Sequence, residues 1–199
     1  METIEYKGFT IEIGIDEFPE DPRENDNLGN MYCLHKRYDL GDKHSFTLED
    51  LRRMPTKADV ISLPLYLYDH SGITISTKPY SCPWDSGQVG IIMVSHDEIK
   101  KEFSRTRLST DLIKQVKRTL AFEVKEYDLF IQGQIYYFKV FDTKGNEVES
   151  CYNFFGEKGC TEEAKAAVDY IVSQKEEKDG QQSDRMEHFI SAVETVTTR

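Results

Sequence analysis

The sequence predicts an α+β fold in which a largely antiparallel sheet packs with two to four helices. Three observations lead to this prediction: short segments alternate between apolar and polar residues, turn residues separate them, and two longer segments show helical periodicity. The strand segments follow one another through hairpin signals, without regular alternation of strands and helices. We therefore expect strands from residues 1–95 and 134–155 to share one core with helices at 109–131 and 161–175, in a single domain of residues 1–178.

The first elements are short. Alternation over residues 4–16 predicts a half-buried strand or hairpin, and the proline-rich, acidic residues 17–30 predict an exposed loop. A short strand at 31–38 is followed by a short helix at 47–54, where Thr47 and Asp50 have the spacing of a capping box.

The stretch from Val60 to Ser76 reads as a hairpin, because two β-prone segments flank the turn residues 69–72. Pro64 has no backbone N–H to donate, so its strand is expected to be at an edge or bulged at that position. Another buried strand at 88–95 ends at a second capping box, formed by Ser95 and Glu98.

The second half contains the longer helices. A helix beginning near Ser109 carries one apolar stripe to Ile131, and a hairpin turns at residues 144–146. Thr161 is the expected N-cap of a helix that ends near residue 175. Residues 179–199 read as a linker and a weakly attached C-terminal helix.

Charge is unevenly distributed along the 199 residues. The formal net charge is −11, and residues 1–30 contain nine acidic and two basic side chains, whereas residues 95–125 contain eight basic and five acidic ones. Such a field repels nucleic acid phosphates, so we expect no direct contact with nucleic acid and a protein partner with a basic surface. No signal peptide and no bilayer-spanning stretch is visible, which predicts a cytoplasmic protein without membrane contact.

The four cysteines are widely spaced and form no CxxC pair, so neither a zinc ribbon nor a disulfide framework is indicated, and we expect reduced thiols. No motif identifies a cofactor. There is no phosphate-binding GxxxxGK[ST] loop, although the ring side chains of Tyr66, Tyr68, Tyr80 and Trp84 could stack on a ligand.

The candidates for catalysis lie in the segment from Asp69 to Ser86. His70, Cys82 and Asp85 supply an imidazole, a thiol and a carboxylate, but "SCPWD" matches no known nucleophile signature. The same residues are equally explained as turn and packing residues. On that interpretation, which we favour, Cys82 and Trp84 are buried, and Asp85 and Ser86 bond to nearby backbone.

A second set of candidates concerns metal binding. The segment "HKRYDLGDKH" offers two imidazoles and two carboxylates within ten residues, which are suitable ligands for zinc, iron or manganese: His35, Asp39, Asp42 and His44. Their spacing matches no standard motif, and the neighbouring cations Lys36, Arg37 and Lys43 oppose a metal ion, so pairing of these carboxylates with cations is the favoured interpretation.

Three segments carry a resemblance to a family: "DPRENDNLGNMYCLHKRYDLGDKH", "LPLYLYDHSGITISTKPYSCPWDSGQVGIIMVS" and "EVKEYDLFIQGQIYYFKVFD". The chain resembles, over most of residues 5–156, uncharacterised proteins that are carried by phages, plasmids and conjugative elements. The resemblance implies an accessory protein of a mobile element in a microbial cytoplasm, and it carries over no catalytic residue.

These observations lead to three hypotheses. The first is a binding protein without catalysis, including the role of a counter-defence factor against a host immune or restriction component. The others are a small hydrolase or nucleotide-handling enzyme that uses the region of His70, Cys82 and Asp85, and a protein that sequesters a ligand there. The binding hypothesis rests on two loops and assigns these residues: Asp69, His70, Ser81, Trp84, Asp85, Ser86, Glu20, Asp21, Glu24 and Asp26.

Overall fold

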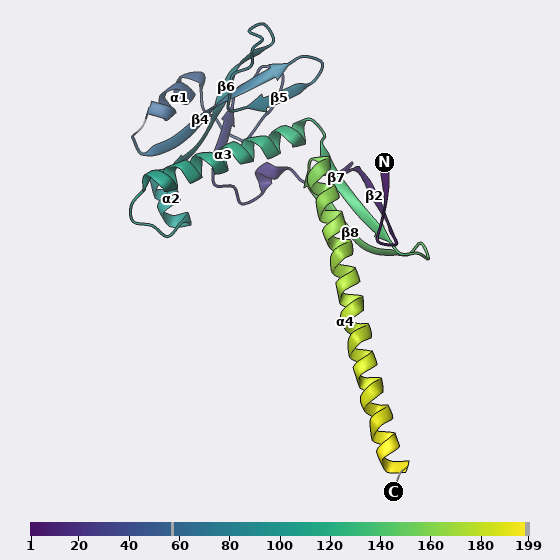
Figure 1. Cartoon of the computed structure of the whole chain (residues 1–199). Coiled ribbons are helices and arrows are strands. Elements are labelled where there is room, and N and C mark those ends of the chain that lie inside the picture. Colours follow the sequence, from purple (N-terminus) through teal and green to yellow (C-terminus); the bar gives the residue numbers. More distant parts are fainter. Residues whose placement is uncertain (57, 198–199) are drawn as a thin grey trace. The chain divides into compact units, whose positions relative to one another are not determined.

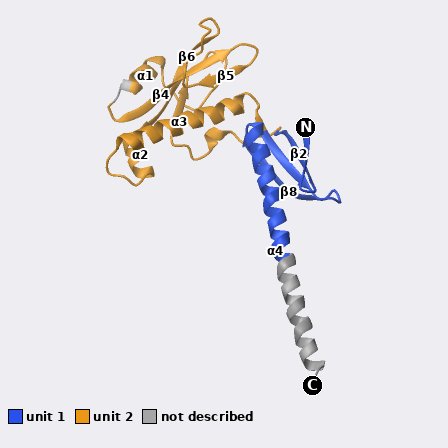
Figure 2. Cartoon of the chain, in the orientation of Figure 1, with its two compact units in different colours: residues 1–16, 136–199 blue, residues 17–135 orange. Residues whose placement is uncertain are grey.

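The computed structural model of the chain describes the backbone of residues 1–56 and 58–197, and the side chains of residues 1–55 and 58–178. The chain divides into two compact units (Figure 2): residues 1–16 with 136–199 form unit 1, and residues 17–135 form unit 2. The sequence suggested one domain with one core. Each unit instead has a hydrophobic cluster of its own.

Unit 1 is a four-stranded antiparallel sheet followed by a helix (Figure 1). Its strands, in the order of the sheet, are β1 (Glu2–Tyr6), β2 (Phe9–Ile15), β7 (Ile135–Phe141) and β8 (Glu147–Phe155), and the helix is α4 (Glu157–Thr197). The pairing of β2 with β7 runs from Thr10 opposite Phe141 to Ile15 opposite Tyr136. The sheet therefore joins two parts of the chain that are far apart in the sequence.

The core of unit 1 lies between this sheet and α4. Alternate residues of β2 and β7 pack against the small side chains of the helix, and the cluster contains Phe9, Ile11, Ile13, Phe138, Val140, Cys160, Ala164 and Val168. At the rim, Lys7 forms a 2.7 Å ion pair with Asp169, and the ammonium of Lys175 lies 4.8 Å from the ring centre of Phe9. These contacts hold the described part of α4 on the β1–β2 hairpin.

Unit 2 is an α+β structure with a second antiparallel sheet. The sheet contains, in order, β3 (Asn30–Cys33), β6 (Ser86–Ser95), β4 (Val60–Asp69) and β5 (Ile73–Ser76). The helices are α1 (Leu48–Arg53), α2 (His96–Glu102) and α3 (Thr110–Ile131), with short 3-10 turns η1 (Pro22–Glu24) and η2 (Met54–Thr56). The prediction of an α+β fold with antiparallel strands is confirmed in both units.

Helix α3 covers one face of the unit 2 sheet (Figure 1). Its apolar stripe of Val116, Leu120, Val124 and Tyr127 belongs to the same cluster as Leu67 and Ile92 of the strands. The opposite face carries Ile91, which is buried and lines a hollow together with Leu51 of α1. The sheet is thus covered on both faces.

Most local predictions are confirmed. Both capping boxes are formed, at Thr47 with Asp50 and at Ser95 with Glu98, and Ser109 caps α3. β4 and β5 form the expected hairpin. Pro64 lies in the part of β4 that β5 does not reach, next to a bulge at Leu65/Tyr66, as its missing N–H requires.

Three predictions differ from the structure. The helix after β8 begins at Glu157, and Thr161 lies inside it, where its Oγ1 donates to the carbonyl of Glu157. The backbone of this helix also continues beyond residue 175, its expected end, to Thr197. Gly156, with φ of +88°, lets the chain turn directly from strand to helix. The single shared core was wrong, because β1 and β2 pair with β7 and not with the strands of residues 17–95. The expectation for residues 179–199 lies outside the described side chains.

In the described part of the chain, no helix is both long enough and apolar enough to cross a membrane.

Candidate functional site

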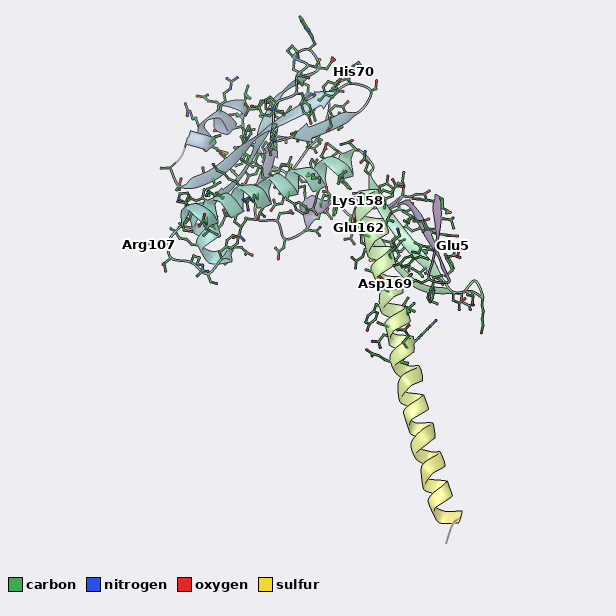
Figure 3. The ribbon with its side chains drawn as sticks, viewed as in Figure 1. Glu5, His70, Arg107, Lys158, Glu162 and Asp169 are labelled. Carbon is green, nitrogen blue, oxygen red and sulfur yellow. The ribbon has the colours of Figure 1, made fainter. Side chains whose placement is uncertain are left out.

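The end of β4 and the start of β6 lie at a hollow of about 340 Å³ in unit 2, and His70 lies at this end of the unit 2 sheet (Figure 3). The hollow is lined by side chains from three segments that are far apart in the sequence. We call the polar and aromatic residues in and around it the tip site: His35, Arg37, Asp69, His70, Cys82, Trp84 and Asp85.

Backbone hydrogen bonds fix the loops of the tip site. Ser71 and Gly72 both have positive φ, and the turn closes with a 3.0 Å bond from His70 N to the carbonyl of Gly72. Asp69 N donates to the carbonyl of Asp85 at 2.8 Å, which extends the β4–β6 ladder by one pair beyond Ser86. The loop that carries Trp84 therefore begins from a fixed base.

Asp69 holds the segment after β3 to the end of β4. The guanidinium of Arg37 forms an ion pair with the Asp69 carboxylate, and the hydroxyl of Tyr38 donates to it at 3.3 Å. The ring of His35 stacks on Tyr38 with 5.1 Å between ring centres. Arg37 and Tyr38 of the sequence "HKRY" therefore both contact the carboxylate of Asp69, which lies 32 and 31 positions later in the chain.

Asp85 brings together the three residues that the sequence suggested for catalysis. Its Oδ2 lies 3.5 Å from His70 Nδ1 and 3.5 Å from Cys82 Sγ. The carboxylate lies between the two other groups, and no hydrogen bond joins the thiol to the imidazole among the described residues. In a catalytic thiol–imidazole pair the imidazole contacts the sulfur directly. Here the carboxylate of Asp85 lies between them instead.

Ser86 also has the expected partner, since its Oγ donates to the carbonyl of Cys82 at 2.5 Å. Cys82 itself is half-buried, and Ser81 is exposed. The carboxylate of Asp85, in contrast, contacts side chains and not the nearby backbone that we expected.

Trp84 overturns the expectation that it anchors the loop in the core, because 92% of it is exposed. The ring projects from the nine-residue loop between β5 and β6, and its neighbours Pro83 and Asp85 do not cover it. A fully exposed indole is unusual on the surface of a protein, and tryptophan is enriched at the energetic centres of protein interfaces.

The acidic segment that was expected to share this surface lies elsewhere in unit 2. Asp21 caps η1 by accepting from Arg23 N at 2.8 Å, while Glu20, Glu24 and Asp26 are exposed. η1 and the loops of the tip site lie on opposite sides of α3 (Figure 1). The two sets of predicted binding residues therefore form two separate surfaces.

A buried network around Arg23 was not predicted from the sequence. Its guanidinium donates to both oxygens of Asp42 at 2.9 Å, to Glu123 at 3.3 Å and to the carbonyl of Gly29 at 2.6 Å. Glu123 accepts in turn from the backbone N–H of Leu28 at 2.8 Å. Burial raises the pKa of the Glu123 carboxyl above its ordinary value, although these hydrogen bonds and the charge of Arg23 act in the opposite direction.

Asp42 and His44, two of the four metal candidates, are engaged in other contacts. Asp42 binds Arg23 and also accepts from Met31 N at 2.6 Å. Both ring nitrogens of His44 have partners, Nε2 with the carbonyl of Cys33 at 2.8 Å and Nδ1 with Phe46 N at 3.1 Å.

The four candidates do not form a metal site. His35 lines the tip hollow, and Asp39 contacts none of the other three in any bond that the structure shows. In the part of the chain that the structure describes, no three His, Cys, Asp or Glu side chains are placed to hold a metal ion. Arg23, nineteen positions away, supplies the positive charge that pairs with Asp42.

A larger hollow of about 910 Å³ lies in unit 1, between β1, β2 and the first turns of α4. Its floor is apolar, and its rim carries charges of both signs, such as Lys158 and Glu162 (Figure 3), which form an ion pair of 3.7 Å. It contains no imidazole or thiol. Of these two hollows, only the tip site has an imidazole and a thiol beside a carboxylate.

No family model matches the chain, and the searches of curated proteins and of solved structures find no match.

Proposed function

We propose that this chain is a binding protein without catalysis, and that the tip site is the surface with which it contacts a partner protein. The observation that carries the proposal is the exposure of Trp84, at 92%, on a loop whose base is fixed by hydrogen bonds. Because these bonds fix the base of the loop, less backbone conformational entropy is lost when a partner covers the ring.

The surroundings of Trp84 also suit a protein interface. Such interfaces combine an aromatic or arginine centre with polar groups at the rim. At the tip site, Arg37 is paired with Asp69 and His70 with Asp85, and all four groups are within reach of solvent. Because the carboxylates of Asp69 and Asp85 already have polar partners, covering them costs less than covering isolated carboxylates.

The resemblance to proteins of mobile elements supports the choice of partner. The proposed partner is a host protein in a microbial cytoplasm, including a component of host defence, and the contact involves no direct binding of nucleic acid. A basic surface on the partner would complement the exposed acidic residues around η1, where Glu20, Glu24 and Asp26 provide a second contact.

Affinity capture with matched variants tests the proposal. The full chain, its Trp84→Ala variant and its Phe122→Ala variant are used as baits in a microbial lysate, and bound proteins are measured by quantitative mass spectrometry. Phe122 is the control, because it is also an exposed aromatic side chain of unit 2, at 57%, but lies on α3. We expect one protein whose recovery falls roughly a hundredfold with Trp84→Ala, since a central aromatic residue contributes about 2–4 kcal/mol.

Equal recovery of every captured protein by the wild-type chain and the Trp84→Ala variant would contradict the proposal. So would a partner that is lost only with Phe122→Ala, because that result would assign the interface to α3.

The second candidate function is a small hydrolase or nucleotide-handling enzyme, or a protein that sequesters a ligand, at the same hollow. The convergence of His70 and Cys82 on Asp85 favours it. Labelling with iodoacetamide at neutral pH separates the candidates. A catalytic thiolate at Cys82 would react much faster than the exposed thiol of Cys151, whereas a thiol in a binding site would not.

A further inference from the structure

The strand β6 has one open edge next to the tip site. β3 ends at Cys33, opposite Gly90, and the last hydrogen bond on this side joins Leu34 N to the carbonyl of Val89 at 2.8 Å. From Ser86 to Gln88, β6 pairs only with β4 on its other side. Within the described residues, no strand pairs with this short edge.

The hydrogen-bond pattern shows which backbone groups point to the open edge. Asp69 N donates to the carbonyl of Asp85, so Asp69 and Asp85 direct their backbone groups toward each other across the ladder. The same holds two residues along, for Leu67 and Gly87. In an antiparallel ladder the intervening residues direct their N–H and C=O groups to the other side. Ser86 and Gln88 therefore present their backbone groups at the open edge.

A hollow lies on each face of the sheet beside this edge, and the two hollows share Val89. The tip hollow includes Leu67, which belongs to the cluster packed on α3. The second hollow, of about 300 Å³, includes Ile91 on the opposite face, together with Leu48 and Leu51 of α1. Gly87 lies between them, and a Cβ atom added there would meet nothing within 4 Å.

These three features match what an added β-strand needs. Its backbone pairs with an open edge, and its side chains alternate between the two faces of the sheet. We propose that a segment of the partner protein binds in extended conformation along Ser86–Gln88 of β6, as an additional strand. This inference rests on the proposed binding function and assigns its mode.

The chemistry of the hollows defines the segment. The hollow beside α1 is lined mainly by apolar residues, so it takes an apolar side chain. In the tip hollow, Arg37 neutralises Asp69, whereas the second carboxylate, Asp85, has no arginine or lysine partner among the described residues, so a basic neighbouring side chain is favoured. A lysine or arginine there also lies within reach of the Trp84 ring, on whose face a cation is favoured. The segment is thus extended, with an apolar residue next to a basic one.

The probe is a library of random linear peptides displayed on phage and selected on the full chain. We expect the enriched peptides to carry a Lys or Arg next to an apolar residue and to slow hydrogen exchange at the amides of Ser86 and Gln88. Methylation of alternate backbone nitrogens in a selected peptide is expected to weaken binding by roughly tenfold or more at every second position, since only one set of amides faces β6.

Two variants at one position separate backbone from side-chain recognition. Gln88→Pro removes the outward N–H, whereas Gln88→Ala removes only the side chain. We expect the proline variant to weaken binding of a selected peptide by roughly tenfold or more and the alanine variant to leave it unchanged, with circular dichroism confirming that both variants fold. The methylated peptides give the same information if Gln88→Pro does not fold.

Several outcomes overturn the inference. One such outcome is a peptide that loses affinity for the Trp84→Ala variant, binds the Gln88→Pro variant normally and tolerates backbone methylation. This outcome would exclude strand addition as the binding mode and leave the proposed function in place. Failure to enrich any peptide would also overturn it. A dimer of this chain that depends on concentration and is abolished by Gln88→Pro would assign the edge to a second copy in place of a partner.

Discussion

The guanidinium of Arg23 holds the carboxylate of Asp42 with two parallel hydrogen bonds of 2.9 Å, from Nε to Oδ1 and from Nη2 to Oδ2. The same group reaches Glu123 on α3, and the side chains of Arg23 and Glu123 are only 5% and 7% exposed. One arginine therefore connects the acidic segment, the loop after β3 and the central helix of unit 2.

Replacement of Arg23 by alanine is expected to lower the free energy of unfolding by about 3–5 kcal/mol, because two carboxylates are left without their cation. Chemical denaturation measures this value. The matched control is Arg53→Ala, which removes an exposed ion pair with Glu49 and is expected to cost less than about 1 kcal/mol. Equal effects of the two substitutions would show that the network does not stabilise unit 2.

The thiol of Cys33 predicts a pH dependence of stability. Burial, helped by the charge of Asp42, raises the pKa of Cys33 from 9.0 to about 12. In the unfolded chain the thiol ionises near its ordinary value, so between these two values the unfolded state loses a proton that the folded state keeps. The contribution of Cys33 is complete below pH 9 and falls by about 1.4 kcal/mol for each pH unit above it.

The measurement compares the free energies of unfolding of the wild-type chain and the Cys33→Ala variant from about pH 8 to about pH 10.5. We expect the difference between them to shift against the wild type as pH rises above the ordinary value. A difference that stays constant over this range would mean that Cys33 ionises equally in both states.

Trp84→Ala is expected to change the free energy of unfolding by less than about 0.5 kcal/mol, because the ring contacts almost nothing in the folded chain. Phe138→Ala is the contrasting variant: Phe138 is 2% exposed in the core of unit 1, and its truncation should cost about 3–5 kcal/mol. Thermal or denaturant unfolding gives both values. A large cost of Trp84→Ala would show that the loop packs its indole in solution.

The four cysteines should react in an order set by their exposure. Cys151 is exposed, Cys82 is half-buried, and Cys33 and Cys160 are buried. We expect iodoacetamide to modify Cys151 first in the native chain and all four thiols after denaturation without reductant. Peptide mapping by mass spectrometry identifies the order, and fewer than four thiols in the denatured chain would disprove the prediction of reduced cysteines.

Asp128 of α3 secures the edge strand β5, since its Oδ1 accepts 2.7 Å bonds from Thr74 Oγ1 and from Ile75 N. Asp128→Ala is expected to cost about 1–3 kcal/mol, because the Ile75 amide loses its acceptor, and to speed hydrogen exchange at that amide. Lys125→Ala, an exposed change on the same helix, should leave both quantities unchanged. Unchanged exchange at Ile75 in the Asp128→Ala variant would contradict this role.

The elements that were predicted correctly depend only on residues that are close together in the sequence. The capping boxes need only Thr47 with Asp50 and Ser95 with Glu98, and the missing N–H of Pro64 explains why it lies in the part of β4 that β5 does not pair with. The division into two units could not be predicted in this way. Alternation shows that residues 9–15 form a strand, but it does not show that their partner is the strand at 135–141.

The tip site was predicted in part. Asp69, His70, Cys82 and Asp85 do lie together, because the β4–β5 hairpin and the start of β6 bring them to one end of a sheet. Arg37 was expected to oppose a metal ion or to pair with a carboxylate of its own segment, and its contact with Asp69, thirty-two positions away, was not predicted. Trp84 was expected in the core from residue type alone, which does not tell whether any element covers the ring.

The pairing of Ile15 with Tyr136 has a consequence for the way in which the protein is made. The ribosome releases β1 and β2 first, but the strand that pairs with β2 follows only after all of residues 17–135. During that interval the apolar side chains of Phe9, Ile11 and Ile13 have no sheet to complete and no α4 to cover them. Unit 2 can fold as soon as α3 has emerged. Unit 1, whose first strands are synthesised earliest, is therefore the last part of the newborn chain to acquire its structure.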